Sequence, residues 1–208
     1  MQKISELLSN LDEDELMKEV KAQLSDGISP EEILKECQDG MVSVGERFGA
    51  GEYFVSDLMM SGAMFKEVGE VLAPYMEGKQ QESIGKVILG TVEGDVHDIG
   101  KDLVYSMLKA GGFEVIDVGI DAAPSAFVDA LKANPDAKVI ALSCLLASCY
   151  DSILHTVDAV KDAGLRDKVK IIIGGGPVNE TVVSYSGADA CGTDAQSAVT
   201  LAKEAYVK

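Results

Sequence analysis

The sequence lacks tryptophan, has no long apolar run and carries little positive charge. Its 18 Lys and Arg residues against 35 Asp and Glu residues give a formal net charge of −17, which disfavours binding to anionic nucleic acid. No apolar run approaches the length of about 20 residues that a membrane-spanning helix needs. Residues 1–10 have neither the basic start nor the apolar core of a signal peptide. We therefore expect a cytoplasmic protein that binds neither nucleic acid nor a membrane.

The sequence also has few histidines and few cysteines. The four cysteines form no C-x-x-C pair, so neither a disulfide framework nor a structural zinc site is expected, and the thiols are predicted to be reduced. The only histidines are His97 and His155, which excludes a site built from several imidazoles. With 47% hydrophobic residues, the composition is otherwise that of a packed globular protein. Any imidazole chemistry therefore depends on whichever histidine has reactive neighbours.

The chain divides near residue 80 into two parts with different sequence patterns. Seven of the eight methionines precede that point, and sixteen of the 22 valines follow it. In the first part, helical periodicity and a start signal at Pro30 predict helices at Glu13–Leu24, Pro30–Phe48 and Ser56–Tyr75. Residues 1–80, with 7 basic and 17 acidic residues, are therefore predicted to form a small acidic helical bundle.

Beyond a polar linker at Met76–Ser83, the pattern changes to alternating strands and helices. Strands are predicted at Lys86–Thr91, Glu114–Val118, Val139–Ser143, Lys170–Ile173 and Ala188–Cys191. Helices are predicted at about Ile99–Ala110, Ser125–Ala133, Tyr150–Ala163 and Ala195–Tyr206. The apolar runs of the first and fourth strands suit a parallel sheet that helices cover on both faces. Residues 84–208 are therefore predicted to form a doubly wound α/β domain whose five parallel strands favour the flavodoxin-like order 2-1-3-4-5.

The turns after the predicted strands carry the polar and glycine-rich segments of the second part. Gly94–Lys101 follows the first strand, Ser143–Cys149 ends the third, and Gly174–Pro177 follows the fourth. The carboxyl ends of parallel strands meet at one edge of the sheet, and ligands of this fold bind there, where strands 1 and 3 adjoin. We therefore expect these three segments to share one site.

His97 lies in the first of these turns, two residues after Asp95. In extended backbone both side chains can point to one side, so that the carboxylate can fix the tautomer and the basicity of a metal-binding imidazole. The alternative is that Asp95 or Asp98 caps the following helix and that His97 is an ordinary surface residue.

A single histidine without neighbouring cysteine ligands cannot supply the several protein ligands of a zinc or non-haem iron site. A macrocycle resolves this difficulty, because its own equatorial nitrogens leave the protein one axial position, as a corrin does for cobalt. The Gly174–Gly176 turn would let the backbone approach such a bulky group, and an ordinary strand-to-loop turn is the alternative. No phosphate-binding loop of the G-x-x-x-x-G-K-[ST] or G-x-G-x-x-G type is present.

The same residues resemble a known motif. Asp95, His97 and Gly100 form the pattern D-x-H-x-x-G. A Ser-x-Leu pattern starting at Ser143 follows after 42 residues, and the glycine turn follows after 28 more. This spacing resembles the cobalamin-binding motif shared by the corrinoid domain of methionine synthase and the corrinoid proteins of methyltransferase systems. Segment Gly51–Met59 resembles the helical cap that precedes the motif in those proteins, so the resemblance covers nearly the whole chain.

The resemblance implies a cap domain at residues 1–80, a cobalamin-binding α/β domain at residues 84–208, and a role for each residue of the site. His97 would be the axial ligand that replaces the cofactor's own lower base below cobalt, the base-off/His-on mode, and Asp95 would be its hydrogen-bonded regulator. Ser143 and the backbone at the glycine turn would line the channel for the cofactor's nucleotide tail. The implied cofactor-binding residues of the α/β domain are Gly94, Asp95, Val96, His97, Asp98, Ile99, Gly100, Ser143, Leu145, Ala147, Ser148, Cys149, Gly174, Gly175 and Gly176.

One position departs from the family pattern. Methionine synthase has a serine that completes the His–Asp relay, and here that position is Cys149, with Ser148 adjacent. Which of the two would join the relay is left open. His155 is expected to be structural, and Lys101 is expected to face solvent or the amide rim of the cofactor.

The family's cap domain presents apolar side chains above the corrin. The side chains expected in that role are Phe54, Met59, Met60 and Met64. The alternative for each of them is the core of the helical bundle, because methionines at helical spacing usually pack there.

The function that the resemblance implies is methyl carriage. Cobalt(I) would accept a methyl group from a substrate held by a partner methyltransferase and yield it to a second enzyme that methylates tetrahydrofolate or coenzyme M. Proton uptake by the pair of His97 and Asp95 would accompany release of the axial ligand. The chain would be non-catalytic alone, and it would also need a reductive activase because cobalt(I) oxidises.

Three alternatives remain at the level of sequence. The first is a cobalamin-dependent sensor or storage module, although no output segment is recognised. The second is the cofactor subunit of an adenosylcobalamin mutase, which normally lacks the helical cap. The third is a flavodoxin-like domain without cobalamin.

Overall fold

The computed structural model describes residues 4–76 and 83–206. The chain forms two compact units, Met1–Glu82 and Ser83–Lys208. Most of the predicted linker Met76–Ser83 falls on residues 77–82, which lie outside the described residues. Among the described helices, none is long and apolar enough to cross a membrane.

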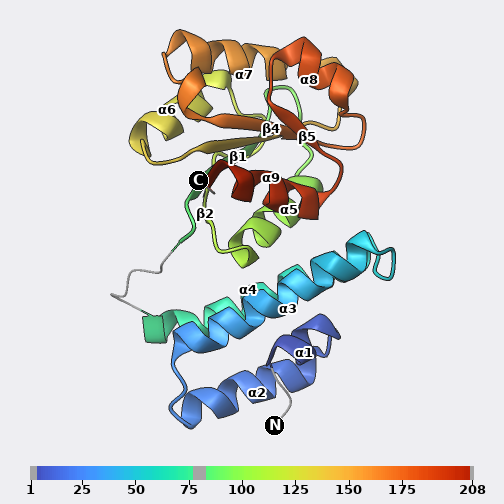
Figure 1. Cartoon of the computed structure of the whole chain (residues 1–208), viewed down its shortest axis with the longest axis vertical. Coiled ribbons are helices and arrows are strands. Elements are labelled where there is room, and N and C mark those ends of the chain that lie inside the picture. The colour runs from blue at the N-terminus through green and yellow to red at the C-terminus, as the bar shows by residue number, and fades with distance from the viewer. Residues whose placement is uncertain (1–3, 77–82, 207–208) are drawn as a thin grey trace. The chain divides into compact units, whose positions relative to one another are not determined.

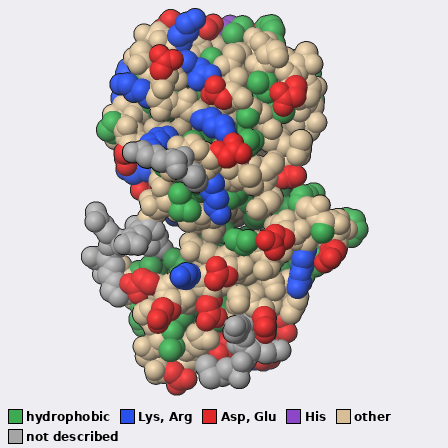
Figure 2. All heavy atoms as spheres, viewed as in Figure 1, with side chains coloured by type: hydrophobic (Ala, Val, Ile, Leu, Met, Phe, Trp, Pro, Cys, Tyr) green, Lys and Arg blue, Asp and Glu red, His purple; other side chains and the backbone are tan. Residues whose placement is uncertain are grey.

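The first unit is helical, as predicted. Its described elements are α1 (Ile4–Ser9), α2 (Glu13–Ser25), α3 (Pro30–Gly49) and α4 (Val55–Met76). Helix α3 begins with a capping box, in which Ser29 and Glu32 each bind the other's backbone N–H, and with Pro30 in its first turn. The helices bury a core that includes Leu16, Ile33, Cys37, Leu58 and Leu72. Asp and Glu dominate the charged side chains on the face of this unit seen in Figure 2.

The second unit is a five-stranded parallel sheet covered by helices, which confirms the predicted fold class and strand order. Its strands are β1 (Lys86–Thr91), β2 (Glu114–Asp117), β3 (Val139–Ser143), β4 (Lys170–Gly174) and β5 (Ala190–Gly192), in the order β2-β1-β3-β4-β5. Its α-helices are α5 (Ile99–Ala110), α6 (Pro124–Ala133), α7 (Tyr150–Asp162), α8 (Glu180–Ser186) and α9 (Ala195–Tyr206). Two short 3-10 turns are η1 (Ala147–Cys149) and η2 (Arg166–Lys168).

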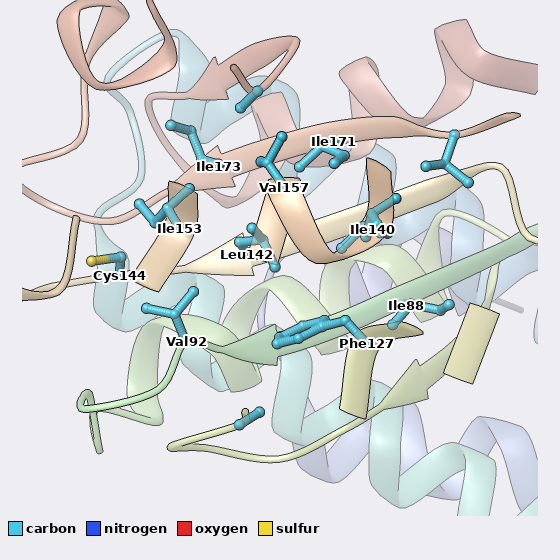
Figure 3. Close-up of a cluster of buried hydrophobic side chains, with 14 of the residues drawn as sticks. Ile88, Val92, Phe127, Ile140, Leu142, Cys144, Ile153, Val157, Ile171 and Ile173 are labelled. Atoms are coloured by element: carbon cyan, nitrogen blue, oxygen red, sulfur yellow. The ribbon is translucent and has the colours of Figure 1, made fainter. Parts of the chain in front are cut away.

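Successive side chains of each strand point to opposite faces of the sheet, so the core of this unit has a part on each face. Ile88, Ile140 and Ile171 belong to one buried cluster and meet Phe127 of α6 and Val157 of α7 (Figure 3). Figure 1 shows α6, α7 and α8 on that face of the sheet and α5 and α9 on the other. Both faces are therefore covered, which explains why the sequence of the central strands reads as continuous apolar runs.

Several short elements differ from the prediction. Helices α1 and α8 and both 3-10 turns were not predicted, and β5 is observed at Ala190–Gly192 where Ala188–Cys191 was expected. The other predicted elements agree with the structure to within one or two residues at each end.

Candidate functional site

The candidate site lies at the carboxyl edge of the sheet, where β1 and β3 are neighbours. Thr91 at the end of β1 pairs with Ser143 of β3, and Ser143 pairs with Gly174 of β4. The chain turns from β1 into α5 on one face of the sheet and from β3 into α7 on the other, so the loops after the two strands diverge at this point. The structure thus brings the three predicted segments to one edge, as expected.

The imidazole of His97 is held by Asp95 from the same loop. Nδ1 of His97 lies 2.6 Å from Oδ1 of Asp95, and the backbone N–H of His97 donates to the same oxygen at 3.1 Å. The hydroxyl of Thr91 donates to the carbonyl of His97 at 3.0 Å. Two side chains of β1 and its following loop therefore fix the ring and the backbone of His97.

The carboxylate of Asp95 is completely buried and accepts hydrogen bonds on both oxygens. Its Oδ2 accepts from the backbone N–H of Leu145 at 2.6 Å and from that of Leu146 at 3.1 Å. Burial raises the pKa of Asp95, but the hydrogen bonds from the His97 ring and from the backbone N–H groups of Leu145, His97 and Leu146 outweigh burial and lower the pKa below its ordinary value.

An ionised Asp95 determines which nitrogen of His97 is available. The carboxylate can only accept, so Nδ1 carries the proton and donates it, and Nε2 keeps its lone pair. Within residues 4–76 and 83–206, no hydrogen bond occupies Nε2, and the side chain of His97 is 47% exposed. The loop therefore presents one basic nitrogen at the surface of the α/β unit.

Neither Cys149 nor Ser148 bonds to Asp95 in the described part of the chain. The thiol of Cys149 is buried beside the Ser148 hydroxyl, with Sγ and Oγ 3.9 Å apart. The hydrogen bonds to Oδ2 of Asp95 come instead from the backbone N–H groups of Leu145 and Leu146. Sequence reasoning missed this because backbone donors leave no mark in a side-chain motif.

The thiol of Cys144, at the start of this turn, is buried. Burial, with the nearby charges of Asp95 and Cys149, raises the pKa of the Cys144 thiol to about 12. The thiol is therefore protonated, and it donates to the carbonyl of Leu146 at 3.3 Å. Among the described residues, no group of three or more His, Cys, Asp and Glu side chains could hold a metal ion.

Exposed apolar side chains follow the strand ends around His97. Ile99, at the start of α5, is 67% exposed, although hydrophobic side chains of this size are usually buried. The full set of exposed apolar residues at this edge is Val96, Ile99, Ile120, Leu145 and Leu146. Ile120 and Leu146 were not predicted, although their position directly after strands 2 and 3 could have indicated them.

The glycine turn after β4 has two different environments. A Cβ at Gly175, where φ is +135°, would overlap the carbonyl oxygen of Cys144, so glycine is required there by the protein itself. At Gly174 a Cβ would meet only the carbonyl of Gly192, at 3.6 Å, and the edge is open there. At Gly175 the need for glycine has a reason within the protein, whereas at Gly174 the packing of the protein does not require it.

In the helical unit, the four predicted cap residues separate into two groups. Phe54 is 71% exposed, and Met59 and Met60 are also exposed near the start of α4. Met64 is only 1% exposed and packs in the core of the unit. The expectation that Met64 presents a side chain to the cofactor is wrong for this structure, because the helix turns that position inward.

The structure also places three further residues that the sequence singled out, and one of them, Lys101, differs from the expectation. Lys101 does not face solvent: it is 4% exposed, and its Nζ bonds to Asp102 at 2.7 Å and to Asp117 at 2.5 Å. Asp98 is the N-cap residue of α5, but its side chain makes no capping hydrogen bond. His155 is exposed on α7, and no hydrogen bond or ion pair engages it in the described part of the chain.

These features suit a planar macrocycle with its own metal. The described residues of the site supply one imidazole nitrogen and an apolar surround, which matches a group whose equatorial ligands come with it. Gly100, whose Cβ would meet no atom within 4 Å, leaves further open space one turn beyond His97.

Comparison with known proteins agrees with this interpretation. Two family models, both described as a B12 binding domain, match residues 85–201 and residues 1–73. The trimethylamine corrinoid protein of Methanosarcina barkeri is 38% identical over 98% of this chain and 94% of its own length.

Solved structures agree as well. A cobalamin-binding protein from Desulfitobacterium hafniense is 39% identical with a TM-score of 0.79, covering 99% of this chain and 97% of its own. The methanol:cobalamin methyltransferase complex of M. barkeri contains a chain that is 25% identical with a TM-score of 0.81, covering 95% of this chain and 76% of its own. The chain therefore belongs to the family of B12-binding corrinoid proteins of methyltransferase systems, and its cofactor is cobalamin or a related corrinoid.

Proposed function

We propose that the protein carries methyl groups on a corrinoid bound in the base-off/His-on mode, with Nε2 of His97 as the lower axial ligand. The observation that carries this proposal is the pairing of His97 with the buried carboxylate of Asp95 at 2.6 Å, which leaves Nε2 as an exposed lone pair. When bound, the corrinoid supplies a cobalt ion that accepts and releases a methyl group.

The protein's own residues would orient this ligand. Asp95 holds a proton on Nδ1 of His97 and is itself held by the N–H groups of Leu145 and Leu146. Metal-binding histidines commonly have such a carboxylate partner, because it fixes the ring and strengthens the other nitrogen as a ligand. The apolar side chains around His97 would cover the lower face of the macrocycle and exclude water from it.

The nucleotide tail of the cofactor would lie along the carboxyl edge of the sheet. Small residues occupy one row across this edge, because Thr91, Ser143, Gly174 and Gly192 are successive neighbours on adjacent strands. No large side chain fills the edge in that row. Ala147 and Gly176 would flank the same channel.

Above the cofactor, Phe54, Met59 and Met60 of the helical unit would contact the upper face. Their exposure in a unit that has its own complete core supports this role. Apolar contacts there would keep water from the reactive axial position.

The partners would be a substrate:corrinoid methyltransferase, a second methyltransferase that passes the group to tetrahydrofolate or coenzyme M, and a reductive activase. The relatives named for trimethylamine and dimethylamine support a methylated amine as the donor. The donor itself would be bound and activated by the partner enzyme.

Single-turnover transfer tests the carrier role. The reduced, corrinoid-loaded protein is mixed with deuteromethyl-labelled trimethylamine and a trimethylamine methyltransferase, and the label on the re-isolated protein is measured by mass spectrometry. We expect the label on the native protein and on a His155→Ala control, and much less on His97→Ala. Absence of label from the native protein, or equal labelling of His97→Ala and the native protein, would contradict the proposal.

A further inference from the structure

The loop that carries His97 is tied to the loop between β2 and α6 by a single residue, Asp121. The backbone N–H of Gly94 donates to Oδ1 of Asp121 at 2.7 Å. The backbone N–H of Asp121 donates in return to the carbonyl of Asp95 at 2.9 Å. Asp121 thus binds the peptide groups on both sides of the Gly94–Asp95 junction.

The backbone at Asp121 is held in an unfavourable conformation. Its φ is +49°, and among the described residues only Leu11 is another non-glycine residue with positive φ. Most side chains are disfavoured in this region, while Asp and Asn tolerate it best. Strain of this kind persists where the surroundings over-determine the backbone, and it is concentrated at functional sites.

The surroundings of Asp121 do hold it firmly. The N–H of Thr91 donates to the carbonyl of Gly119 at 2.9 Å, and the N–H of Ala122 donates to the carbonyl of Thr91 at 3.0 Å. A β-bridge joins Val92 to Ala122. The loop is therefore fixed to β1 on both sides of Asp121, which gives its carboxylate a rigid base.

Gly94, the other partner, also has positive φ, at +85°. The turn at Gly94 leads directly into Asp95, and a change in its backbone would move the Asp95 side chain relative to its donors. Asp95 tolerates little movement, because its two oxygens must meet the His97 ring and the N–H groups of Leu145 and Leu146 at once.

We propose that Asp121 is a positioning residue for His97. Its carboxylate and its N–H clamp the Gly94–Asp95 junction, and that clamp places Asp95 so that the imidazole is presented in one orientation. The consequence for cobalt rests on the proposed ligation by His97, whereas the clamp itself is a property of the protein without cofactor.

Two substitutions at position 121 separate the effect of the carboxylate from the effect of the positive φ. Asp121→Gly removes the acceptor oxygen and accepts positive φ without steric strain, although the glycine also makes the loop more flexible. Asp121→Asn keeps an acceptor oxygen and tolerates the same φ. Asp129→Asn, an exposed position on α6, is the control for the loss of one negative charge.

The first measurement is amide hydrogen exchange of the apoprotein by NMR. In Asp121→Gly the Gly94 amide should exchange about tenfold faster, the effect of losing a hydrogen bond to a charged acceptor. Asp121→Asn keeps a neutral acceptor oxygen and should exchange at a rate between the native protein and Asp121→Gly, whereas Asp129→Asn should stay close to the native rate. The clamp would be refuted if the Gly94 amide of Asp121→Gly exchanged at the native rate. It would also be refuted if this amide exchanged as fast in Asp121→Asn as in Asp121→Gly.

The second measurement is the electron paramagnetic resonance spectrum of the cobalt(II) form. Asp121→Gly should lower the fraction of the signal that shows histidine nitrogen coupling, and Asp121→Asn should restore it. An unchanged fraction in the glycine variant would refute the positioning role. Absence of the coupling in the native protein would instead refute ligation by His97, so the two failures are distinguishable.

Discussion

At the scale of the residue, Asp95 connects two parts of the chain that sequence alone keeps apart. Its spacing from His97 predicts their pairing, because two side chains separated by one residue can share one side of a loop. Its bonds to Leu145 and Leu146 span 50 and 51 residues and exist only because β1 and β3 are adjacent. The D-x-H motif therefore predicts half of the environment of Asp95, and the topology supplies the other half.

Asp95→Asn tests how strongly this carboxylate controls the ligand. The amide cannot accept from every donor that now meets the carboxylate, and it no longer holds the Nδ1 proton through a charge. We expect histidine ligation, measured from the visible spectrum of the loaded protein in the cobalt(III) and cobalt(II) states, to weaken by about 10–100-fold.

Cys149→Ser is the comparison for this experiment, because that thiol makes no bond to Asp95 in the described part of the chain. It should change ligation much less. If histidine ligation changed strongly in Cys149→Ser and stayed native in Asp95→Asn, Cys149 in the turn after β3, and not Asp95, would control the ligand.

At the scale of the element, long periodic segments were predictable and single turns were not. Helix α4 has 22 residues and α8 has 7, so α8 completes too few turns for an apolar period to stand out. Asp121 was missed for a related reason. It lies in an irregular loop, and its importance comes from a spatial neighbour, Gly94, that is 27 residues away.

Lys101 joins two elements at the edge of the site, because it bonds from α5 to Asp117 at the end of β2. Burial lowers the pKa of Lys101, but the hydrogen bonds and charges of Asp102 and Asp117 outweigh burial and raise it above its ordinary value. A raised pKa in the folded state means that the stabilisation is fully present below the unfolded pKa and is lost as pH rises through the folded one.

Lys101→Met should therefore lower the free energy of unfolding of the apoprotein by about 1–3 kcal/mol at neutral pH. The difference from the native protein should persist up to a pH of about 10.4 and shrink above it. Urea unfolding at several pH values measures this, with Lys109→Met on the same helix as the control. A difference that grows as pH rises through this range would contradict the ion-pair explanation.

At the scale of the whole molecule, the two units differ in net charge and in their proposed roles. Residues 1–82 contain 7 basic and 18 acidic residues, and residues 83–208 contain 11 and 17, so most of the net negative charge belongs to the helical unit. That unit has its own core and still exposes Phe54, Met59 and Met60. The proposed contact of these three side chains with the cofactor would account for their exposure.

Oxidative footprinting tests the proposed role of the exposed methionines. Hydroxyl radicals should oxidise Met59 and Met60 readily in the apoprotein, and corrinoid loading should protect both, because the macrocycle would cover them. Met64, which is 1% exposed, is an internal control that should react slowly in both states. Equal oxidation of Met59 and Met60 with and without corrinoid would contradict their role above the cofactor.

The most direct test of the central claim, that His97 is the axial ligand of cobalt, is the cobalt(II) electron paramagnetic resonance spectrum of protein labelled with ¹⁵N-histidine. The chain has only 2 histidines, so His155→Ala leaves His97 as the sole labelled imidazole. Ligation by His97 predicts that labelling changes each nitrogen triplet into a doublet, in the native protein and in His155→Ala alike. Triplets that persist after labelling would show that the nitrogen belongs to the cofactor's own base, and would contradict the account.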